Sequence, residues 1–465
     1  MKVLLINPLT IEDSMVNITP NLGLGYLATA LRDNDYEVEI WDGVKLGMTR
    51  QKLIERLNRA DYDVAGFQVY TRSVRNCEEV LQMVKSIKPD TITLAGGPHP
   101  SGDPEGTMKH LLVDYAFRGE AEIGLVQLLD KISGRADMPY EEINNLIWKD
   151  NDGKVTSNPL KPIEDLNVVA MPSWDLIDPR EYPYAPIGAF SKKNPLTSIS
   201  TTRGCPYSCT FCANRTIMGR KVRARNAEIV LQEMELLHDK YGIREFQIID
   251  DNFTSRKALS LGVCEGILAK GWDIALSFPN GVRLSTLDEE ILSLLEKAGC
   301  YSLGLGIESG SLNTLKNMKK AQSLDEIREK VELIHRVTKI RTTGFFIIGY
   351  PTETKEDIMQ TIKFSQELPI DRAQFTICLP VPGSEMTEQM IKSGKLADID
   401  FSDISFQNIL HVPEGMTMDE LKKYRLKAYT GFYLRLRIIL GLFSEIQNME
   451  HVKFLYRRVA KLFSK

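Results

Sequence analysis

Residues 201–214 of this 465-residue chain read Thr-Thr-Arg-Gly-Cys-Pro-Tyr-Ser-Cys-Thr-Phe-Cys-Ala-Asn, and this stretch brings three cysteines into one short loop. Iron-sulfur clusters and structural zinc ions normally have four protein ligands. Three thiolates therefore predict an iron-sulfur cluster held by Cys205, Cys209 and Cys212, with one iron left for another ligand. A zinc knuckle is the alternative, and the absence of a second Cys-x-x-Cys hook in the sequence argues against it. The other cysteines stand singly in apolar segments and are expected to be buried: Cys77, Cys264, Cys300 and Cys378.

The cysteine loop follows the first of a series of short apolar strands that alternate with helical stretches. The expected strands are Leu196–Thr201, Glu245–Ile249, Ile274–Phe278, Tyr301–Gly306, Thr342–Ile348 and Ala373–Cys378. This alternation predicts a partial (β/α)6 barrel over residues 196–395, with its reactive face at the carboxyl ends of the strands. The cysteine loop is expected on that face.

Residues 1–137 show a similar alternation. The expected strands are Val3–Asn7, Glu37–Trp41, Val64–Val69, Thr91–Ala95 and Tyr115–Arg118. The expected helices are Leu22–Asp33, Arg50–Arg59, Val74–Ile87 and Ala121–Ile132. This order predicts an α/β fold with a flavodoxin-like, doubly wound parallel sheet. Ligands of such sheets bind beyond the carboxyl ends of the strands, which directs attention to the loops that begin there.

Two further regions complete the chain. Residues 138–195 are rich in proline and lack periodicity, which predicts a linker packed across both domains. Residues 396–465 are expected to be a helical region, in which bulky apolar residues alternate with arginine from Tyr433 onward. The basic residues near its end are Lys453, Arg457, Arg458, Lys461 and Lys465. Such a surface could lie on anionic lipid or grip a hydrophobic substrate, and a helical pair packed on the barrel is the alternative.

Composition restricts the class and location of the protein. A net charge of −4 gives no general signature of nucleic-acid binding, so no nucleic-acid partner is expected. Residues 1–8 read as a buried strand ended by a turn rather than as a signal peptide. We expect a cytoplasmic protein with reduced thiols, which could also lie at the inner face of the membrane.

The cysteine loop resembles that of the radical S-adenosylmethionine (SAM) superfamily. The segments Pro20–Ala28, Ala95–Pro100 and Arg118–Glu122 resemble the cobalamin-binding domain that precedes many radical SAM domains. The resemblance implies a 4Fe-4S cluster whose open iron is chelated by SAM, reductive cleavage of SAM to a 5′-deoxyadenosyl radical, and cobalamin held against the barrel mouth. It places the chain with the cobalamin-binding radical SAM enzymes, which include methylases of unactivated carbon and the anaerobic magnesium-protoporphyrin cyclase.

The same resemblance implies which residues hold SAM. The expected set is Phe211, Asp250, Asp251, Asn280, Arg283, Glu308, Phe346 and Ile348. The two aspartates would bind the α-ammonium, because a carboxylate and an ammonium form a strong charge-assisted hydrogen bond. Helix capping is their alternative role. Glu308 would accept a bond from a ribose hydroxyl, and Phe346 or Ile348 would pack on adenine. Phe211 is the preferred aromatic contact, because single aromatic residues in strands usually belong to the core.

Cobalamin contacts are expected in the loops that follow the strands of the N-terminal sheet. The expected set is Pro8, Leu9, Tyr70, Thr71, Arg72, Gly96, Gly97, His99, Gly119 and Glu120. Gly96 and Gly97 are the firmest, because a bulky ligand approaches the backbone closely where no Cβ stands. No Asp-x-His-x-x-Gly motif occurs in the sequence, so the loop containing Arg72 is expected to face cobalt instead. His99 would line the cleft for the nucleotide tail, and a solvent-facing histidine is the alternative. A dinucleotide site is disfavoured, because no full Gly-x-Gly-x-x-Gly follows the first strand.

The resemblance implies methyl transfer to an unactivated carbon as the first function. The alternative within the class is an oxidative or ring-forming reaction on a tetrapyrrole- or lipid-like substrate, in which cobalamin does not donate methyl. A non-catalytic cobalamin and iron-sulfur sensor, or an electron-transfer module, is the alternative from another class. The expected partners are a small hydrophobic substrate and an electron donor such as flavodoxin or ferredoxin.

Overall fold

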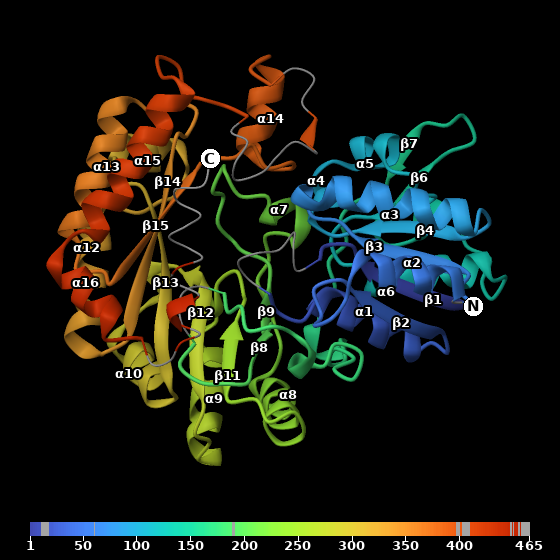
Figure 1. Ribbon diagram of the computed structural model, residues 1–465, viewed down its shortest axis with the longest axis horizontal. Coiled ribbons are helices and arrows are strands. Elements are labelled where there is room, and N and C mark those ends of the chain that lie inside the picture. The colour runs from blue at the N-terminus through green and yellow to red at the C-terminus, as the bar shows by residue number, and fades with distance from the viewer. Residues whose placement is uncertain are drawn as a thin grey trace.

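The computed structural model describes residues 1–10, 18–59, 61–187, 191–396, 400–401, 410–446, 449, 451–453 and 456. Two α/β units lie side by side, with the cysteine loop and α7 (Asn214–Ile217) between them (Figure 1). The N-terminal unit contains one seven-stranded sheet, and the second unit contains a six-stranded parallel sheet. This is the α/β architecture that the sequence predicted.

The N-terminal sheet has the strand order β2-β1-β3-β4-β5-β6-β7. Its first five members pair in parallel, in the order of a flavodoxin-like sheet. They are β1 (Lys2–Asn7), β2 (Glu37–Asp42), β3 (Val64–Gln68), β4 (Ile92–Gly96) and β5 (Tyr115–Phe117). Each begins and ends within one residue of its predicted bounds.

Two antiparallel strands extend this sheet into the segment that we expected to be linker. They are β6 (Leu146–Lys149) and β7 (Val155–Ser157), joined by a turn in which the side chain of Asp150 accepts bonds from the backbone N–H groups of Asp152 and Lys154. The sheet therefore continues to Ser157, beyond the expected domain limit at residue 137. Strand β6 was missed because Leu-Ile-Trp is a short apolar run without alternation.

Helices cover both faces of the N-terminal sheet. They are α1 (Leu22–Arg32), α2 (Arg50–Arg59), α3 (Val74–Ile87), α4 (Pro98–Gly102), α5 (Pro104–His110) and α6 (Glu122–Ile132). Helices α1 and α6 contribute to one buried apolar cluster, whereas α2, α3 and α5 contribute to another. The short helices α4 and α5 replace the turn that we expected after β4, because Pro98 and Pro104 both stand where proline favours the start of a helix.

The second sheet has the strand order β15-β14-β13-β12-β11-β8, and all neighbours pair in parallel. Its strands are β8 (Leu196–Ile199), β11 (Glu245–Ile248), β12 (Ala275–Val282), β13 (Cys300–Glu308), β14 (Arg341–Ile348) and β15 (Arg372–Ile377). All six were predicted. The helices of this region are α8 (Ala227–Lys240), α9 (Lys257–Lys270), α10 (Glu289–Lys297), α11 (Leu312–Asn317), α12 (Leu324–Val337), α13 (Lys355–Glu367) and α14 (Glu385–Lys392).

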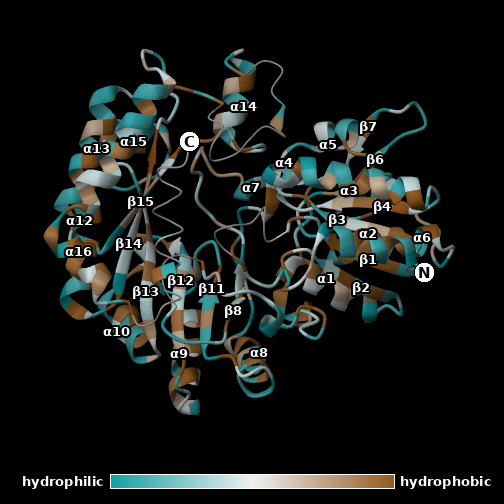
Figure 2. Ribbon diagram, in the orientation of Figure 1, coloured by the Kyte–Doolittle hydropathy of each residue, from teal (hydrophilic) through white to brown (hydrophobic). Residues whose placement is uncertain are grey.

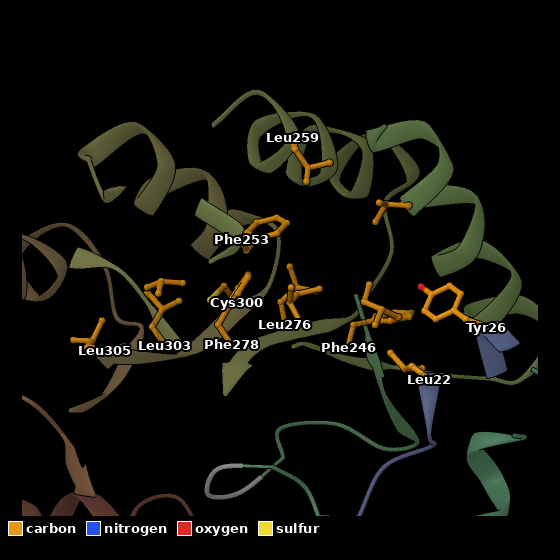
Figure 3. Packing of buried hydrophobic residues seen from close by; sticks show 14 of the residues in the cluster. Leu22, Tyr26, Phe246, Phe253, Leu259, Leu276, Phe278, Cys300, Leu303 and Leu305 are labelled. Carbon is orange, nitrogen blue, oxygen red and sulfur yellow. The ribbon is translucent and has the colours of Figure 1, made fainter. Parts of the chain in front are cut away.

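A continuous apolar core joins the two units. Phe246, Phe253 and Phe278 of the barrel belong to the same buried cluster as Leu22 and Tyr26 of α1 (Figure 3). The segment between the units contributes as well, because the indole N–H of the buried Trp174 donates to Glu233 of α8 at 3.0 Å. The isolated cysteines Cys77, Cys264, Cys300 and Cys378 are all buried, as predicted.

The C-terminal region packs on the barrel through α15 (Met418–Tyr433) and α16 (Leu436–Phe443). Helix α15 lies along the edge strand β15, where Tyr429 and Tyr433 bond the strand backbone. Helix α16 consists mostly of hydrophobic residues (Figure 2), and three of them, Leu436, Leu440 and Phe443, are exposed. In the residues that the structure describes, no helix is long and apolar enough to cross a membrane. The basic residues Arg457, Arg458, Lys461 and Lys465 lie outside the described residues.

Candidate active site

A small hairpin carries all three loop cysteines. Strands β9 (Thr202–Arg203) and β10 (Arg223–Ala224) pair antiparallel and form its base, and residues 204–222 form its loop. Gly204 has φ +91°, and a Cβ there would lie 2.3 Å from the carbonyl oxygen of Lys221. Glycine is required because the loop folds back on its own start at this point. The Cys205 N–H donates to the Gly219 carbonyl at 3.3 Å and ties the two ends of the loop together.

The thiols of the loop remain accessible. Cys205 and Cys209 are partly exposed and Cys212 is exposed, whereas the four isolated cysteines are buried. Among the described residues, no three His, Cys, Asp or Glu side chains form a group that could hold a single metal ion. A 4Fe-4S cluster needs no such convergence, because each thiolate binds a different iron. The three loop thiols are therefore reachable by a ligand from solvent.

The barrel holds the middle of the loop through backbone and hydroxyl contacts. The Thr210 N–H donates to the Met318 carbonyl at 3.0 Å, and the Met386 N–H donates to the Thr210 carbonyl at 2.8 Å. The hydroxyls of Thr210 and Tyr350 are 2.8 Å apart, and Tyr350 also donates to the Asn317 carbonyl. Sequence reasoning missed Tyr350, because its contact with the loop spans 140 residues of chain.

The two adjacent aspartates have different environments. Asp250 is buried and accepts bonds from the N–H and hydroxyl of Thr201, at 2.6 and 2.5 Å. Asp250 therefore fixes the start of the cysteine hairpin, and both of its carboxylate oxygens are bonded to Thr201 rather than available to a ligand. Asp251 is exposed in the barrel mouth, where Asn214 donates to it at 2.8 Å. Desolvation by the surrounding protein raises the pKa of Asp251 to about 6. Of the predicted pair, only Asp251 faces the site.

Glu308 forms a buried ion pair with Lys320, whose Nζ lies 2.7 Å from Oε1. Glu308 has φ +68°, a left-handed backbone that is uncommon for glutamate and sits at a register shift of β13. A Cβ at Gly306 would lie 2.8 Å from the Glu308 carboxylate and 2.9 Å from the Lys320 ammonium. Glycine at 306 thus makes room for the pair. Sequence reasoning missed Lys320, which follows α11 and not a strand.

Arg283 and Asn280 lie at the end of β12. The Arg283 Nη2 donates to the carbonyls of Lys320 and Ala321, at 2.6 and 2.9 Å, and its guanidinium lies 3.7 Å from the ring centroid of Tyr207. Tyr207 stands between the first two loop cysteines, so Arg283 joins the Lys320 turn to the cysteine loop. Asn280 is exposed and its amide donates to the Ile249 carbonyl at 2.6 Å.

The predicted adenine contacts on β14 require a correction. Phe346 is 1% exposed and stacks on Phe375, and Ile348 is 0% exposed. Both belong to the core beneath the outer helices, because side chains alternate between the two faces of a strand. The residues on the inner face are Phe345 and Ile347, which are partly exposed. A Cβ at Gly304 would lie 2.7 Å from the Phe345 ring, so that ring covers the glycines of the neighbouring strands.

Phe211 lies at the border between the cysteine loop and a sulfur-rich apolar cluster. It packs with Ile347 against Met318, Tyr350, Cys378, Met386 and Met390. Methionine and cysteine are polarizable side chains that contact aromatic rings favourably. Phe211 therefore presents an apolar surface next to Cys212 in the sequence, and Ile347 from the inner face of β14 packs against the same cluster.

Two loops of the N-terminal sheet form an accessible edge that suits a corrinoid. Tyr70 and Arg72 are exposed after β3, and a Cβ at Gly96 would meet no atom within 4 Å. Gly97 has φ +110°, which only glycine adopts readily. His99 is buried, which lowers the pKa of its imidazole, and its Nδ1 lies 3.4 Å from the Thr71 hydroxyl. The solvent-facing alternative for His99 is therefore wrong.

Four of the predicted corrinoid residues are engaged elsewhere. Pro8 and Leu9 are buried, and Leu9 packs with Tyr182. A Cβ at Gly119 would lie 2.9 Å from the Ile217 carbonyl of the cysteine loop. Glu120 is 5% exposed and accepts bonds from Arg203 and Arg223. Gly119 and Glu120 therefore contact the cysteine hairpin, and the Glu120 side chain is buried while Gly119 is partly exposed.

A hollow of about 300 Å³ lies away from these residues, between α1, α6 and residues 163–170. Its walls include Tyr26, Thr29, Glu122 and Val168, and none of the predicted site residues. The cysteine loop and the polar strand ends meet at the barrel mouth, which is therefore the candidate site.

The fold and the site define a class, in which a cobalamin-type sheet precedes a radical SAM barrel. The family model "Radical SAM superfamily" matches residues 199–365, and the model "B12 binding domain" matches residues 10–129. The chain is 31% identical to an uncharacterized methyltransferase of Pyrococcus horikoshii, over 99% of this chain and 97% of the relative. It is 25% identical to the anaerobic magnesium-protoporphyrin IX monomethyl ester cyclase of Rubrivivax gelatinosus, over 89% of this chain and 74% of the relative.

A solved structure agrees with this class. The radical SAM methyltransferase TsrM of Kitasatospora setae, with cobalamin and a [4Fe-4S] cluster bound, superposes with a TM-score of 0.69 at 20% identity and covers 90% of this chain and 80% of its own. The chain belongs to the cobalamin-dependent radical SAM methyltransferase family, which has anaerobic cyclases among its members. It is an enzyme, and SAM and cobalamin are the cofactors of its two domain families. The non-catalytic alternative is thereby set aside.

Proposed function

We propose that this enzyme transfers a methyl group to an unactivated carbon of a small hydrophobic molecule at the barrel mouth. The contact between the two cofactor regions carries the proposal. Helix α4, which follows the Gly96-Gly97 turn, packs on α7 of the cysteine loop. A Cβ at Gly102 would lie only 2.4 Å from the Pro382 carbonyl, so the corrinoid edge also meets the loop after β15. A substrate bound next to this contact would lie near both cofactors.

The cluster would be held by Cys205, Cys209 and Cys212, and the corrinoid by the loops at Tyr70–Arg72 and Gly96–Gly97. When bound, the cluster supplies the electron that cleaves SAM to a 5′-deoxyadenosyl radical, and the corrinoid supplies the methyl group. The protein contributes binding, orientation and exclusion of water. We assign no residue to proton transfer.

The SAM pocket would combine polar groups at the strand ends with one apolar wall. Asp251 would accept a bond from the α-ammonium, and Lys320 would bind an anionic or hydroxyl oxygen while holding Glu308 in place. Asn280 and Arg283 lie at the end of β12. The Arg283 guanidinium donates to the Lys320 carbonyl and so holds the turn that contains Lys320. Phe345, Ile347 and Phe211 would contact adenine in place of Phe346 and Ile348.

The loop after β3 would contact the bound corrinoid. Arg72 is exposed at this position, and the buried His99 lies against Thr71 on the neighbouring loop. An arginine disfavours a strong axial ligand, because a guanidinium has no lone pair to donate at neutral pH. Replacement of Arg72 with histidine is therefore expected to shift the absorbance of bound hydroxocobalamin toward that of a nitrogen-ligated form.

Anaerobic reconstitution with iron, sulfide and hydroxocobalamin tests the reaction type. We would add SAM and dithionite, and measure 5′-deoxyadenosine and S-adenosylhomocysteine separately by mass spectrometry. Both products are expected for methyl transfer, because one SAM supplies the radical and a second supplies the methyl group. 5′-Deoxyadenosine alone would favour the oxidative or ring-forming alternative, to which the cyclase relatives point. The triple alanine variant of the loop cysteines is the control and should yield neither product.

Two partners are proposed beyond the substrate. A flavodoxin or ferredoxin would supply the electron, and its replacement of dithionite in the same assay tests this. Helix α16 would touch a membrane surface through Leu436, Leu440 and Phe443, which are 71%, 60% and 66% exposed and recur at helical spacing. Arg435 and Arg437 do not serve this surface, because they bond the carbonyls of Gln366 and Ile370. Loss of sedimentation with anionic liposomes in Leu440→Glu, compared with the wild type, is the expected result.

A further inference from the structure

Glu120 lies at the centre of a buried ion cluster that joins the two units. Its Oε1 accepts a bond from Arg203 at 2.8 Å, and its Oε2 accepts from Arg223 at 2.6 Å and from the Ile163 N–H at 2.8 Å. Arg203 also donates to Glu122 at 2.7 Å. The side chains of Glu120 and Arg223 are each 2% exposed. Two carboxylates and two guanidinium groups thus balance one another, with Glu120 and Arg223 buried and Arg203 and Glu122 at 10% and 11% side-chain exposure.

The two arginines occupy the base of the hairpin that carries the cysteines. Arg203 and Arg223 are direct partners in the β9–β10 pair, and Cys205 follows Arg203 after a single glycine. Arg223 further donates to the carbonyls of Ile163 and Met218, at 2.7 and 2.8 Å. One carboxylate of the N-terminal unit therefore holds both ends of the cysteine loop at once.

The same carboxylate is connected to the corrinoid edge. Glu120 follows Gly119, whose N–H donates to the Ser101 hydroxyl at 2.8 Å. Ser101 in turn donates to the carbonyl of Gly97 at 2.7 Å. A continuous series of hydrogen bonds and adjacent residues leads from the Gly97 turn to Arg203 and the first cysteine.

We propose that Glu120 is a positioning residue that fixes the cysteine hairpin on the corrinoid-binding unit and transmits corrinoid occupancy to that hairpin. This positioning role differs from the sequence-based prediction, in which Glu120 contacts the corrinoid directly. A buried carboxylate with three donors has no remaining exposure for a ligand, and a buried charge is retained in the interior only when it is paired. The proposal rests on the assignment of the two cofactor regions, and does not depend on whether the reaction is methyl transfer or cyclisation.

Backbone hydrogen exchange of the full-length protein tests this inference without turnover. Exchange would be followed by mass spectrometry over residues 204–222, with and without hydroxocobalamin. In the wild type, hydroxocobalamin should slow exchange of this loop, because it stabilises the Gly97 turn to which the loop is joined. Glu120→Gln should speed exchange of the loop about tenfold and abolish the cobalamin-dependent slowing, while the Kd for hydroxocobalamin stays within about threefold.

A matched control exists on the same hairpin. Lys221 pairs with Glu164 on the surface, where their side chains are 72% and 69% exposed. Glu164→Gln removes the same type of charge from an exposed pair with Lys221 of the same hairpin and should leave exchange and binding unchanged. If Glu120→Gln unfolds the whole chain, Arg203→Lys decides. A lysine keeps the charge but lacks the guanidinium, whose Nη1 donates to both Glu120 and Glu122.

Three results would overturn the proposal. One is a rate of hydrogen exchange over residues 204–222 that is the same in Glu120→Gln or Arg203→Lys as in the wild type. Another is a loss of hydroxocobalamin affinity of more than tenfold with unchanged loop exchange, which would restore Glu120 as a corrinoid ligand. The third is a wild-type loop whose exchange does not respond to hydroxocobalamin at all.

Discussion

The hydroxyl of Tyr433 accepts a hydrogen bond from the N–H of Ala373 at 3.2 Å and donates one to the carbonyl of the same residue at 2.9 Å. Tyr429, one helical turn earlier, does the same for Phe375, with both distances 3.3 Å. Ala373 and Phe375 lie on β15, the edge of the barrel sheet. Exposed strand edges favour pairing with other chains. Helix α15 therefore supplies hydrogen-bond partners to the backbone N–H and C=O groups of Ala373 and Phe375, at the edge strand of the incomplete barrel.

The double variant Tyr429→Phe/Tyr433→Phe tests this edge protection. It should lower the free energy of unfolding by roughly 1–3 kcal/mol, because four backbone and hydroxyl bonds are lost while the ring packing remains. It should also increase concentration-dependent aggregation, measured by light scattering. Tyr424→Phe on the same helix is the control, since its hydroxyl makes no hydrogen bond with the described residues. Equal unfolding free energies and equal aggregation of the double variant and Tyr424→Phe would show that Tyr429 and Tyr433 do not protect the edge of β15.

The Glu308–Lys320 pair predicts a separation between stability and SAM binding. Lys320→Met should destabilise the protein by about 3–5 kcal/mol, because it leaves a buried carboxylate unpaired. The double variant Glu308→Gln/Lys320→Met should recover most of that stability. It should still bind SAM at least tenfold more weakly, as measured by equilibrium dialysis on the reconstituted protein. Wild-type SAM affinity in the double variant would exclude both residues from the pocket.

The two faces of β14 provide a matched pair of substitutions. Phe346→Ala should lower the free energy of unfolding by about 3–5 kcal/mol, because it leaves a cavity in the helix-facing core. Phe345→Ala should cost less stability, since its ring is partly exposed, and should weaken SAM binding. Denaturant unfolding and SAM titration separate the two effects. Weaker SAM binding in Phe346→Ala, with a larger loss of stability in Phe345→Ala, would instead support Phe346 as the adenine contact.

The buried carboxyl of Glu245 predicts a pH-dependent stability. It accepts bonds from the N–H groups of Lys192 and Lys193 and from the Tyr301 hydroxyl, at 2.7, 2.8 and 2.8 Å. Burial raises the pKa of Glu245 to about 7, above the usual value for glutamate. Between the unfolded and folded pKa values the folded state binds the extra proton, so this group's stabilising contribution falls as pH rises from about 4.5 to about 7.

Glu245→Gln removes this proton linkage. The difference in melting temperature, variant minus wild type, should therefore increase from pH 5 to pH 8. A matched measurement on Glu235→Gln, at a partly exposed surface pair with Lys270, should show no comparable trend. A difference that stays constant with pH would show that the Glu245 carboxyl does not bind the proton in the folded state.

The sequence by itself determined the elements that depend on local pattern. The parallel strands of both sheets follow from short apolar runs between turns, and the loop of Cys205, Cys209 and Cys212 follows from spacing alone. The antiparallel strands β6 and β7 and the inner face of β14 escaped this reasoning. In Gly-Phe-Phe-Ile-Ile the residues on both faces are apolar, so no alternation indicates which ones face the barrel.

Only the tertiary structure decided which polar residues belong to the site. Asp250 and Asp251 are neighbours in sequence, yet one binds Thr201 and the other faces the barrel mouth. Glu120 looked like a loop residue beside a ligand, and its partners Arg203 and Arg223 lie 83 and 103 residues away. The physical reason is that burial and ion pairing are set by the packing of distant segments, whereas strand and loop patterns are set by neighbouring residues.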